Sequence, residues 1–432
     1  MAPASGWCFE STGSGSASDR DRATTRGHET SMSRALEGVV VLDLSSELFG
    51  SLAGALLGDF GATVIRVVDL ADPRKVDHDR DGMHPPERWN SLDELAHRNK
   101  QSLAVNLGDP AGREILGKLV RGADVFLTDL PFRELEEKGW DYRSLCELRS
   151  DIVYARGSGF GPKGPDRDLP AYDELAAART GVMPTLVQPG QPPVYTGVGQ
   201  MQTAVMLALG ILIALYHRDQ SGEGQIVDAS LLGGNMYSQS LDMQAYLAMR
   251  EDRFLEPISR LDSSNPMSGP MYPSADGRWV TLAMPDTDKY WPVFAGIVGL
   301  DVGDPRFDSH EKRCGEHRLE MMRVLEERFR RRPASHWKEE LDRAQLPADV
   351  IEKYDYPASD PIALRNRYIL QLDHPSHGPI QSLGFPIHMS ESPARLRSMA
   401  PCVGQHSAEI LQERLGCSDV EIEALAARGV IG

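Results

Sequence analysis

The feature that most constrains the fold is an alternation of β-branched runs and helical segments that begins after residue 32. The run VVVLDL at 39–44 suits a strand that is buried on both faces, and TVIRVV at 63–68 has the same character. Between them, residues 49–60 carry small and apolar side chains at helical spacing, and Gly61 suits the end of that helix. This order of strand, helix and strand predicts the opening of a parallel, Rossmann-like sheet.

The same alternation continues further along the chain. A helical pattern lies at 110–121, and strand-like runs lie at 102–105, 125–127, 151–155 and 226–229. A long apolar helix begins near Met201 and precedes the last of these runs. Because parallel strands need crossover helices, the pattern predicts an α/β fold class with helices on both faces of a parallel sheet.

The middle of the chain has a different character. Residues 272–284 read YPSADGRWVTLAM, and Asp276 followed by Gly277 is a strong signal for a two-residue hairpin turn. Charged helical patterns follow at 313–332 and 335–343. We therefore expect a smaller α+β domain here.

The last segment and the N-terminus complete the predicted division. From about Asp373 the chain carries extended runs and then an acidic helix at 407–415. The first residues are rich in Ser, Gly and Thr and have no apolar core, which predicts disorder and no secretory signal. The predicted parts are a disordered extension at 1–31, a first part of the large domain at 32–235, a linker at 236–265, the small domain at 266–360, and a linker with a return to the large domain at 361–432.

Charge and cysteine usage exclude several classes of function. The 432-residue chain has a formal net charge of -17, which argues against nucleic acid or an anionic membrane as a partner. Its five cysteines show no paired or metal-type spacing, and the histidines near the C-terminus lack ligand spacing, so we predict no metal site. The longest apolar run, 204–216, is too short to span a bilayer. These features predict a cytoplasmic protein.

The first strand-to-helix turn bears on cofactor binding. It reads SSELFGS and lacks the GxGxxG pattern that lets a pyrophosphate approach the backbone. Asp69 follows the second strand, where a ribose-binding acid would lie, but Asp is also common in turns. The later TGVGQ has only two glycines. We expect no nicotinamide cofactor.

Five sequence blocks occur in an order that is typical of one protein family. They are ALEGVVVLDLS, HRNKQSLAVNLGDPAGREIL, SGFGPKGPDRDLPAYDELAAARTG, GILIALYHRDQSGEGQIVDASL and GQHSAEILQERLG. Together they resemble CoA-transferase family III, the CaiB/BaiF family of formyl-CoA transferase, carnitine CoA-transferase and α-methylacyl-CoA racemase. The resemblance implies a Rossmann-like large domain built from both chain ends and an interlocked homodimer. It also implies coenzyme A or acyl-CoA as substrate, a carboxylic acid acceptor and no permanently bound cofactor.

The family's catalytic residues are replaced in this chain. Family transferases use an aspartate to attack the thioester and form a mixed anhydride, and that aspartate falls on Gln200 here. No carboxylate lies between Glu174 and Asp219. The racemase branch pairs the aspartate with a histidine, whose position is occupied by Tyr172 beside Asp173. The resemblance therefore places Gln200, Tyr172 and Asp173 at the catalytic position without the family's chemistry.

The resemblance also suggests residues that bind CoA, each with a simpler alternative. Asn99 and Lys100 match a block that lies by the CoA phosphates, although Lys100 also fits a solvated charge at a strand edge. Arg74 lies where an arginine is common near CoA, but it also fits a surface loop. Ser158 begins the turn SGFG, and Gly199 directly precedes Gln200. The glycines at these two places let the backbone approach a ligand, or they only form a turn.

A further departure weakens the expected CoA site. The family's Asn-Phe-Arg-Pro-Gly stretch reads TDLPFRELEEKG here, and Glu136 and Glu137 lie close to where an arginine is common.

Gln200 leaves several functional hypotheses open. A side-chain amide is a poor nucleophile, but it can donate a hydrogen bond to a thioester carbonyl at the start of a helix. The chain is then an active transferase that uses another carboxylate such as Asp173, a non-catalytic subunit beside an Asp-bearing paralogue, or a lyase or isomerase assisted by Tyr172 and Gln200. The simplest alternative is that Gln200 is a polar helix-terminal residue without a ligand.

Overall fold

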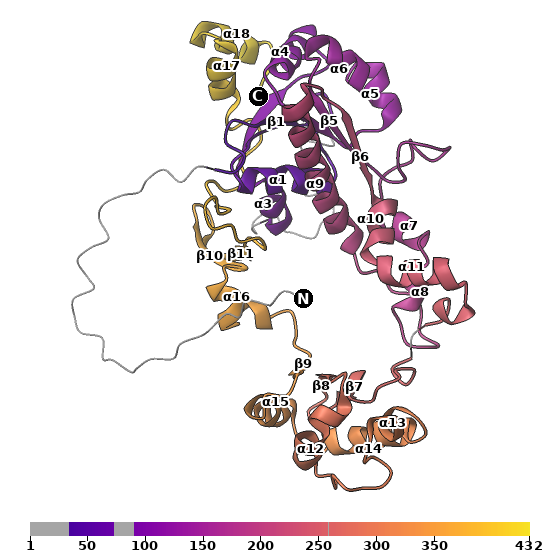
Figure 1. Cartoon of the computed structure of the whole chain (residues 1–432). Coiled ribbons are helices and arrows are strands. Elements are labelled where there is room, and N and C mark those ends of the chain that lie inside the picture. Colours follow the sequence, from indigo (N-terminus) through magenta and orange to yellow (C-terminus); the bar gives the residue numbers. More distant parts are fainter. Residues whose placement is uncertain (1–33, 73–89, 258) are drawn as a thin grey trace, which may run out of the picture.

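The computed structural model describes residues 34–72, 90–257 and 259–432 (Figure 1). The predictions for 1–31 and for Arg74 lie outside these residues. The chain forms a larger body with a six-stranded sheet and a smaller body with its own three-stranded sheet (Figure 1).

A six-stranded sheet forms the centre of the larger body. Its strands are β1 (Val40–Asp43), β2 (Thr63–Asp69), β3 (Lys100–Val105), β4 (Val125–Thr128), β5 (Val153–Ser158) and β6 (Ile226–Ser230). They pair in parallel in the order β3-β2-β1-β4-β5-β6. This confirms the predicted α/β class and parallel sheet. The strand order changes direction between β1 and β4, where open sheets of this type place ligands, beyond the carboxyl ends of the strands.

Helices cover both faces of this sheet. On one face, α1 (Leu48–Asp59) and α9 (Val198–Ser221) pack over a core that contains Leu57, Leu207 and Ile211. The helices of the opposite face are α4 (Pro110–Arg121), α5 (Phe132–Lys138), α6 (Tyr142–Leu148), α17 (Ser407–Leu415) and α18 (Asp419–Ala427). Burial on both faces explains why β1, β2 and β4 read as continuous apolar runs and not as alternating ones, whereas the edge strand β6 is only partly buried.

The helix α4 illustrates how local sequence sets these elements. The Asp109 side chain accepts a hydrogen bond from the Ala111 backbone N–H at 2.8 Å and caps the N-terminus. Pro110 occupies the first turn, where its missing N–H costs nothing, and Lys118 and Arg121 lie in the last turn, where cations suit the helix dipole. The helix therefore begins and ends at the predicted residues.

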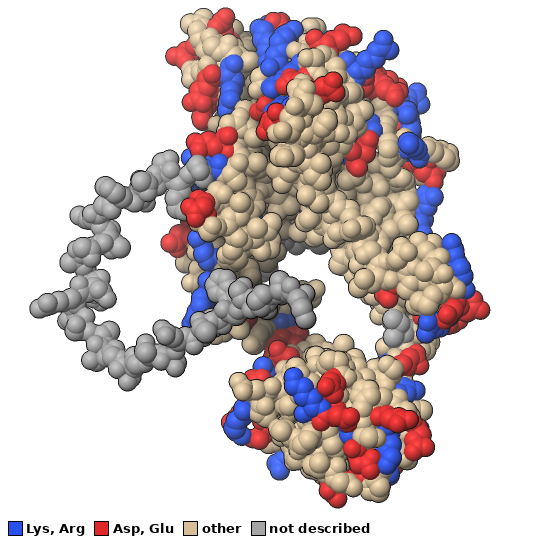
Figure 2. Space-filling view, in the orientation of Figure 1, with Lys and Arg blue, Asp and Glu red and all other residues tan. Residues whose placement is uncertain are grey.

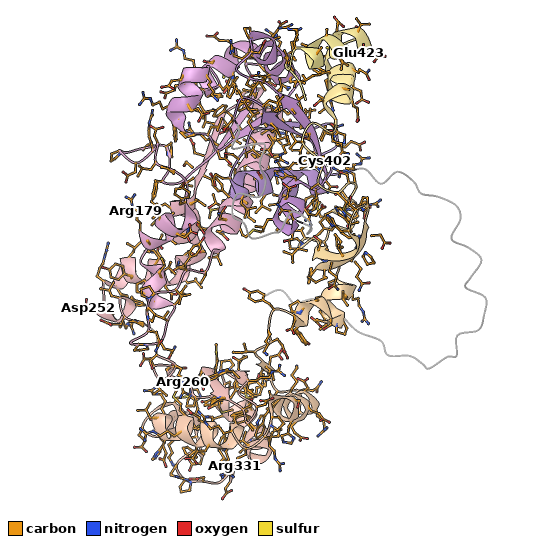
Figure 3. All side chains as sticks on the ribbon, turned by 180° about the vertical axis from the view of Figure 1, so that it is seen from behind. Arg179, Asp252, Arg260, Arg331, Cys402 and Glu423 are labelled. Carbon is orange, nitrogen blue, oxygen red and sulfur yellow. The ribbon has the colours of Figure 1, made fainter. Side chains whose placement is uncertain are left out.

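The C-terminal segment returns to the larger body beside β3. The His406 and Gly432 backbone N–H groups donate to the carbonyls of Ser102 and Ala104. The helix α18, which the hydrophobic pattern does not predict, follows a capping box between Ser418 and Glu421. Cys402 and Glu423 can be located on this body from behind (Figure 3).

The smaller body is built from the middle of the chain. It contains the strands β7 (Ser268–Pro273), β8 (Trp279–Ala283) and β9 (Ala348–Val350) and the helices α12 (Thr287–Val298), α13 (His310–Cys314), α14 (Arg318–Phe329) and α15 (Ala334–Arg343). Its separate core includes Tyr272, Phe294 and Phe329. β7 and β8 pair antiparallel, which confirms the predicted hairpin.

One helix prediction in the smaller body is wrong. The pattern at 313–332 predicts a single helix, but the chain forms α13 and α14 with a break at Gly315. A Cβ at Gly315 would lie 2.5 Å from the Glu311 carbonyl oxygen, so the tight exit from α13 requires glycine. Arg313 is fully buried, contacts Asp288 and lies over the Trp291 ring.

The remaining elements lie outside the two sheets with their main helices. Of these, α3 (Ser91–His97), α7 (Asp173–Ala178) and α10 (Leu231–Ser238) pack against α1 or α9 of the larger body. The others are α8 (Val182–Thr185), α11 (Ser240–Met249), η1 (Asp252–Phe254), η2 (Tyr356–Ala358), α16 (Pro361–Arg365), β10 (Ile369–His374) and β11 (Gly378–Leu383). The space-filling view shows an open gap between the two bodies, bounded by two separate stretches of chain (Figure 2). Tyr354 on one of these stretches is fully exposed.

Candidate functional site

The N-terminus of α9 is the centre of the candidate site. Gly197 precedes the helix with a φ of 70°, a left-handed conformation that favours glycine. No side chain caps this end, and its first turn carries no acidic residue. The first backbone N–H groups of a helix have no partner within the helix, and the helix dipole makes this end attractive to negative charge.

Gln200 lies in this first turn. Its side-chain oxygen Oε1 is buried, and it has no hydrogen-bond partner in the described part of the chain. A buried acceptor without a partner costs about 1–3 kcal/mol. The predicted position of Gln200 at the start of a helix is confirmed, and the side chain carries an unused acceptor.

Asp173 lies beside this helix end at the start of α7. It is only 1% exposed. Its Oδ2 accepts a hydrogen bond from the Tyr195 hydroxyl at 2.7 Å, and its Oδ1 accepts one from the Asn235 side-chain amide at 2.7 Å. Asn235 belongs to α10, so the carboxylate joins α7, α10 and the loop that leads into α9.

Gly199 allows this close approach. A Cβ at this position would lie 2.0 Å from Asn235 Nδ2 and 2.1 Å from Asp173 Oδ1, closer than real Cβ atoms come. The Thr203 hydroxyl donates to the Gly199 carbonyl oxygen at 2.7 Å. Gly199 is therefore required by packing around Asp173, a role that its position in the sequence does not indicate.

The two tyrosines near the site have different environments. Tyr172 is 55% exposed. The Tyr195 hydroxyl is tied to Asp173, and burial, followed by this hydrogen bond, raises the pKa of Tyr195. Because a raised pKa makes the phenol a weaker acid, Tyr195 holds the carboxylate in place more readily than it releases a proton.

The turn between β1 and α1 is bound by a carboxylate of the chain itself, that of Asp129. Asp129, after β4, accepts hydrogen bonds from the backbone N–H groups of Ser46 and Glu47, both at 2.8 Å. These groups lie just before α1, where a dinucleotide-binding fold presents its N–H groups to pyrophosphate. These two N–H groups are therefore paired within the chain.

Lys100 is buried in the structure. Its Nζ lies 2.7 Å from Asp43 Oδ2 and donates to the Ser51 carbonyl oxygen at 2.7 Å. Burial lowers the pKa of the Lys100 ammonium, and the charge of Asp43 opposes this shift. The alternative that Lys100 is a solvated charge at a strand edge is therefore wrong. A Cβ at Gly54 would lie 2.8 Å from Asp43 Oδ2, so α1 needs glycine above the pair.

Asn99 links an N-terminal segment of the larger body, at Asp59, to a C-terminal segment, at Arg395 and Arg397. Its backbone is left-handed, with a φ of 62°, and its amide donates to Asp59 Oδ1 at 2.8 Å and to the Arg395 carbonyl oxygen at 2.9 Å. Its Oδ1 accepts from the Arg397 backbone N–H at 2.6 Å. Asn and Lys in this block therefore have structural partners, whatever they contribute to a ligand.

Ser158 closes the SGFG turn. Its hydroxyl accepts a hydrogen bond from the Gly161 backbone N–H at 3.1 Å, and the residue is buried at the end of β5. The turn continues toward α7, since the Gly159 carbonyl accepts from the Leu232 backbone N–H at 3.0 Å. Ser158 and Gln200 therefore lie on segments that both pack against α10.

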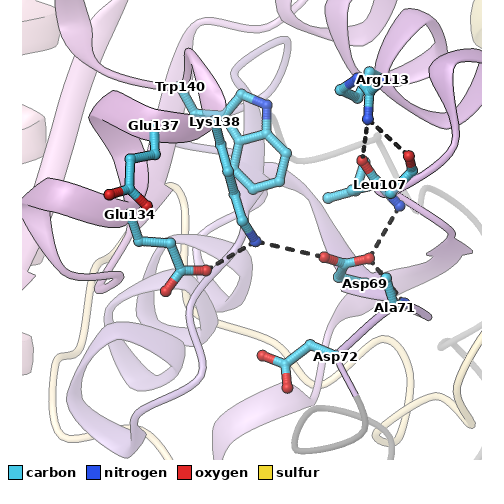
Figure 4. A pocket seen from close by; sticks show the side chains of 10 residues that line it. Asp69, Ala71, Asp72, Leu107, Arg113, Glu134, Glu137, Lys138 and Trp140 are labelled. Carbon is cyan, nitrogen blue, oxygen red and sulfur yellow. Dashed lines mark hydrogen bonds and ion pairs between the residues drawn. The ribbon is translucent and has the colours of Figure 1, made fainter.

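A cavity of about 590 Å³ lies at the carboxyl ends of β2 and β3 (Figure 4). It is lined by Asp69, Ala71, Asp72, Leu107, Gly108, Arg113, Glu134, Glu137, Lys138 and Trp140. Lys138 pairs with Glu134 at 2.8 Å and Asp69 at 3.8 Å, and its ammonium lies over the Trp140 ring. Arg113 donates to two backbone carbonyls. The described lining thus has four carboxylates against two engaged cations.

Arg113, Lys138 and Trp140 are absent from the residues predicted from sequence. The only signal that could have indicated them is topological, because ligands of parallel sheets bind beyond the strands' carboxyl ends. Within the described ranges, no group of three or more His, Cys, Asp and Glu side chains is arranged to hold a metal ion.

One face of α9 is apolar and exposed. The exposed residues recur at helical spacing and are Met201, Val205, Leu209, Ile213 and Tyr216, the last being 70% exposed. Among the described helices, α9 has the length and composition that would allow it to cross a membrane, and 44% of its most apolar stretch is buried within the fold. Its other face packs on β5, β6 and α1, so α9 is a core helix with one uncovered apolar face.

Comparison with known proteins gives concordant matches over most of the chain. Residues 36–407 match the family model described as CoA-transferase family III. The chain is 31% identical to a succinyl-CoA–D-citramalate CoA-transferase of Chloroflexus aurantiacus, over 92% of this chain and 98% of that protein. It is 29% identical to a cinnamoyl-CoA:phenyllactate CoA-transferase of Clostridium sporogenes, over 90% of this chain and 95% of that protein. A crystal structure of a CaiB/BaiF family protein from Brucella suis superposes with a TM-score of 0.76 at 25% identity, over 88% of this chain and 99% of that chain.

Proposed function

The chain belongs to CoA-transferase family III, and on that premise we propose that it binds the acyl-CoA thioester of an organic acid at the N-terminus of α9. In this proposal the thioester carbonyl faces the backbone N–H groups of the first turn, which suit a polarised oxygen. The family's covalent step does not occur at position 200. The observation that carries the proposal is Gln200 itself, with its unused polar atom at an uncapped helix end.

Chemistry argues against an acyl anhydride on this residue. A nucleophile must offer an ionised or activated lone pair, and a neutral amide offers neither at physiological pH. Gln200 can still hold a ligand through hydrogen bonds. Binding and covalent transfer are therefore separable in this chain.

Asp173 is poorly suited to replace the missing aspartate. Both of its oxygens accept short hydrogen bonds, from Tyr195 and Asn235, and the carboxylate is buried. The two hydrogen bonds make the carboxylate less nucleophilic, and an attack on a thioester would require the buried group to move past Gly199. We therefore propose a structural role for Asp173.

A second candidate function is that of a non-catalytic subunit. Position 200 lacks the family's nucleophile, whereas Gly199 and Thr203 beside it are closely packed. This contrast favours a chain that keeps the fold of the site without its catalytic residue. A second chain is also favoured by the apolar face of α9, because monomeric soluble proteins rarely expose large contiguous apolar patches. We propose that either a copy of this chain or an Asp-bearing paralogue covers that face.

The cavity beside β2 and β3 is the proposed seat for the nucleotide end of CoA. Its position beyond the strands' carboxyl ends supports this assignment. Its four carboxylates oppose binding of phosphates, so free CoA should bind weakly. The predicted contributions of Asn99, Lys100 and Ser158 to CoA binding stay proposals, as does a cytoplasmic location.

A thermal-shift panel tests the proposed function. The purified full chain is heated with a set of acyl-CoA thioesters of small organic acids, each compared with its free acid at the same concentration. A thioester present at one hundred times its Kd should stabilise the fold by about 2.7 kcal/mol and raise Tm by a few degrees. If no thioester in a broad panel raises Tm more than its free acid, the proposed binding is wrong.

A further inference from the structure

A buried carboxylate lies where the strand order of the large sheet changes direction. Asp129 follows β4, and the backbone N–H groups that it accepts from, those of Ser46 and Glu47, follow β1. The packing around it is close, because a Cβ at Gly50 would lie 2.5 Å from Asp129 Oδ2. In open sheets of this type such N–H groups bind the phosphates of a ligand. Here the chain's own negative charge holds them.

A second carboxylate at the same edge of the sheet has the same arrangement. Asp69 ends β2 and lines the cavity beside β2 and β3 (Figure 4). Its Oδ1 accepts hydrogen bonds from the backbone N–H groups of Ala71 and Leu107, both at 3.0 Å. These N–H groups follow β2 and β3, where a phosphate would find its donors, and they are also paired within the chain.

The cations of the cavity are engaged as well (Figure 4). Lys138 Nζ lies 2.8 Å from Glu134 and 3.8 Å from Asp69. Arg113 donates to two backbone carbonyls after β3. The described lining holds two further carboxylates, so its charge is negative overall. Phosphate recognition depends on available N–H donors or cations, and the groups described at this edge are committed to one another.

The two parts of a CoA thioester meet this edge differently. The pantetheine arm is uncharged and carries amides, which can bind to neutral or acidic surroundings. The nucleotide carries phosphates, which the carboxylates of the cavity repel. The formal net charge of -17 adds a repulsive field at longer range. The edge therefore suits a ligand that lacks the nucleotide.

Resting on the proposed function, we infer that this chain recognises the acyl-pantetheine part of its ligand, and that the carboxylates of this edge exclude the nucleotide's phosphates from contributing to affinity. Acyl-pantetheine thioesters without the nucleotide are then ligands of the same site. A single charge-assisted hydrogen bond to a phosphate would favour the CoA thioester by roughly 10- to 150-fold. Without such a bond, the CoA thioester should bind no more than about fivefold more tightly than its pantetheine counterpart.

Matched carriers test this inference by calorimetry on the full chain. Butyryl-CoA is compared with S-butyryl-pantetheine, and phenylacetyl-CoA with S-phenylacetyl-pantetheine, so that each pair differs only in the nucleotide. Each pair is measured at low and at high salt. Because salt screens repulsion, the affinity for the CoA member relative to the pantetheine member should rise with salt, whereas an attractive phosphate contact would make it fall.

A variant in the cavity makes the test specific to its charges. Glu134→Gln removes one carboxylate partner of Lys138, so the CoA members should bind roughly 2- to 10-fold more tightly at low salt. The pantetheine members should bind as they do to wild type. Glu136→Gln is the control, since it makes the same charge change on α5 at a residue that does not line the cavity.

Two results would overturn the inference and leave the proposed function in place. One is wild type that binds the CoA members more than fivefold more tightly than the pantetheine members. The other is an equal gain in CoA affinity from Glu134→Gln and Glu136→Gln, because the carboxylates of the cavity would then have no special effect. If none of the four thioesters binds, the proposed function fails and this inference fails with it.

Discussion

At the residue scale, the contacts of Asp173 bear on whether it can replace the aspartate that is missing at position 200. Asp173, with its neighbour Glu174, is among the nearest carboxylates in sequence on the N-terminal side of Gln200, and the sequence leaves it open as a replacement nucleophile. In the fold, two short hydrogen bonds engage both of its oxygens, and Gly199 packs directly against it. Neither contact can be predicted from the sequence, because Tyr195 and Asn235 meet Asp173 only through tertiary packing.

A substitution at Asp173 tests this structural role. Asp173→Asn replaces a double acceptor by a group with one acceptor and one donor, so one buried donor loses its partner. We expect the free energy of unfolding to fall by about 1–3 kcal/mol, measured by denaturant titration.

The neighbouring Glu174→Gln supplies the control for Asp173→Asn. Glu174 is exposed, and Glu174→Gln removes one negative charge, as Asp173→Asn does. Substitutions at such surface positions usually change the free energy of unfolding by no more than about 0.5 kcal/mol. If both variants were equally stable, Asp173 would not have the proposed role.

The surroundings of Lys100 also could not be predicted from the sequence. The block that contains it is recognisable in the sequence, but burial of its ammonium against Asp43 is set by α1 crossing above it at Gly54. Sequence pattern identifies such a residue without showing which side of the strand it faces or what it meets there.

At the element scale, the strands and the longer helices of the sheet follow the sequence pattern closely. The apolar runs predict β1, β2 and β4 because a strand that is covered on both faces needs continuous apolar residues, and they also locate the less buried edge strand β6. The pattern fails where a boundary depends on a single backbone contact, as at Gly315 between α13 and α14. It also misses α18, whose capping box gives a start signal but whose hydrophobic stripe is weak.

The helix α5 carries a prediction about CoA affinity. Glu137 lines the cavity, whereas Glu136 on the same helix does not. Glu137→Arg replaces a negative charge with a positive one beside the proposed nucleotide seat, so affinity for CoA should rise by roughly 3- to 30-fold at low salt and less at high salt.

Glu136→Arg is the matched control on α5, and calorimetry with free CoA at two salt concentrations is the measurement. Equal gains from the two variants would indicate a general effect of charge and would remove the cavity from the proposed site.

At the scale of the whole molecule, the comparisons show the family, and the exposed apolar face of α9 carries a prediction about assembly. The family model and the relatives confirm the resemblance that the five sequence blocks indicate. The described chain also leaves an apolar face on α9 uncovered and a gap between its two bodies (Figure 2). Assembly is a property of surfaces that meet another chain, so a single sequence predicts it only through resemblance.

A charge on the apolar face of α9 tests assembly. Ile213→Asp places a carboxylate in the middle of that face, and burying an unpaired charge in an apolar interface is costly. We expect wild type to have at least twice the mass of one chain in solution and Ile213→Asp to shift toward the monomer, measured by light scattering after size exclusion.

Gln220→Asp, on the same helix beyond the apolar stripe, should leave the mass unchanged. A monomeric wild type would show that α9 is not covered by a copy of this chain and would leave the paralogue as the proposed partner.

We propose that this chain binds an acyl-CoA without forming the family's acyl intermediate at position 200, and intact-protein mass spectrometry distinguishes binding from acyl transfer. Wild type and Gln200→Asp are incubated in parallel with an acyl-CoA that binds, quenched in acid and weighed by intact-protein mass spectrometry. We expect no acyl or CoA adduct on wild type, and an adduct on Gln200→Asp because the carboxylate restores a competent nucleophile. A stoichiometric adduct on wild type that disappears in Asp173→Asn would contradict it.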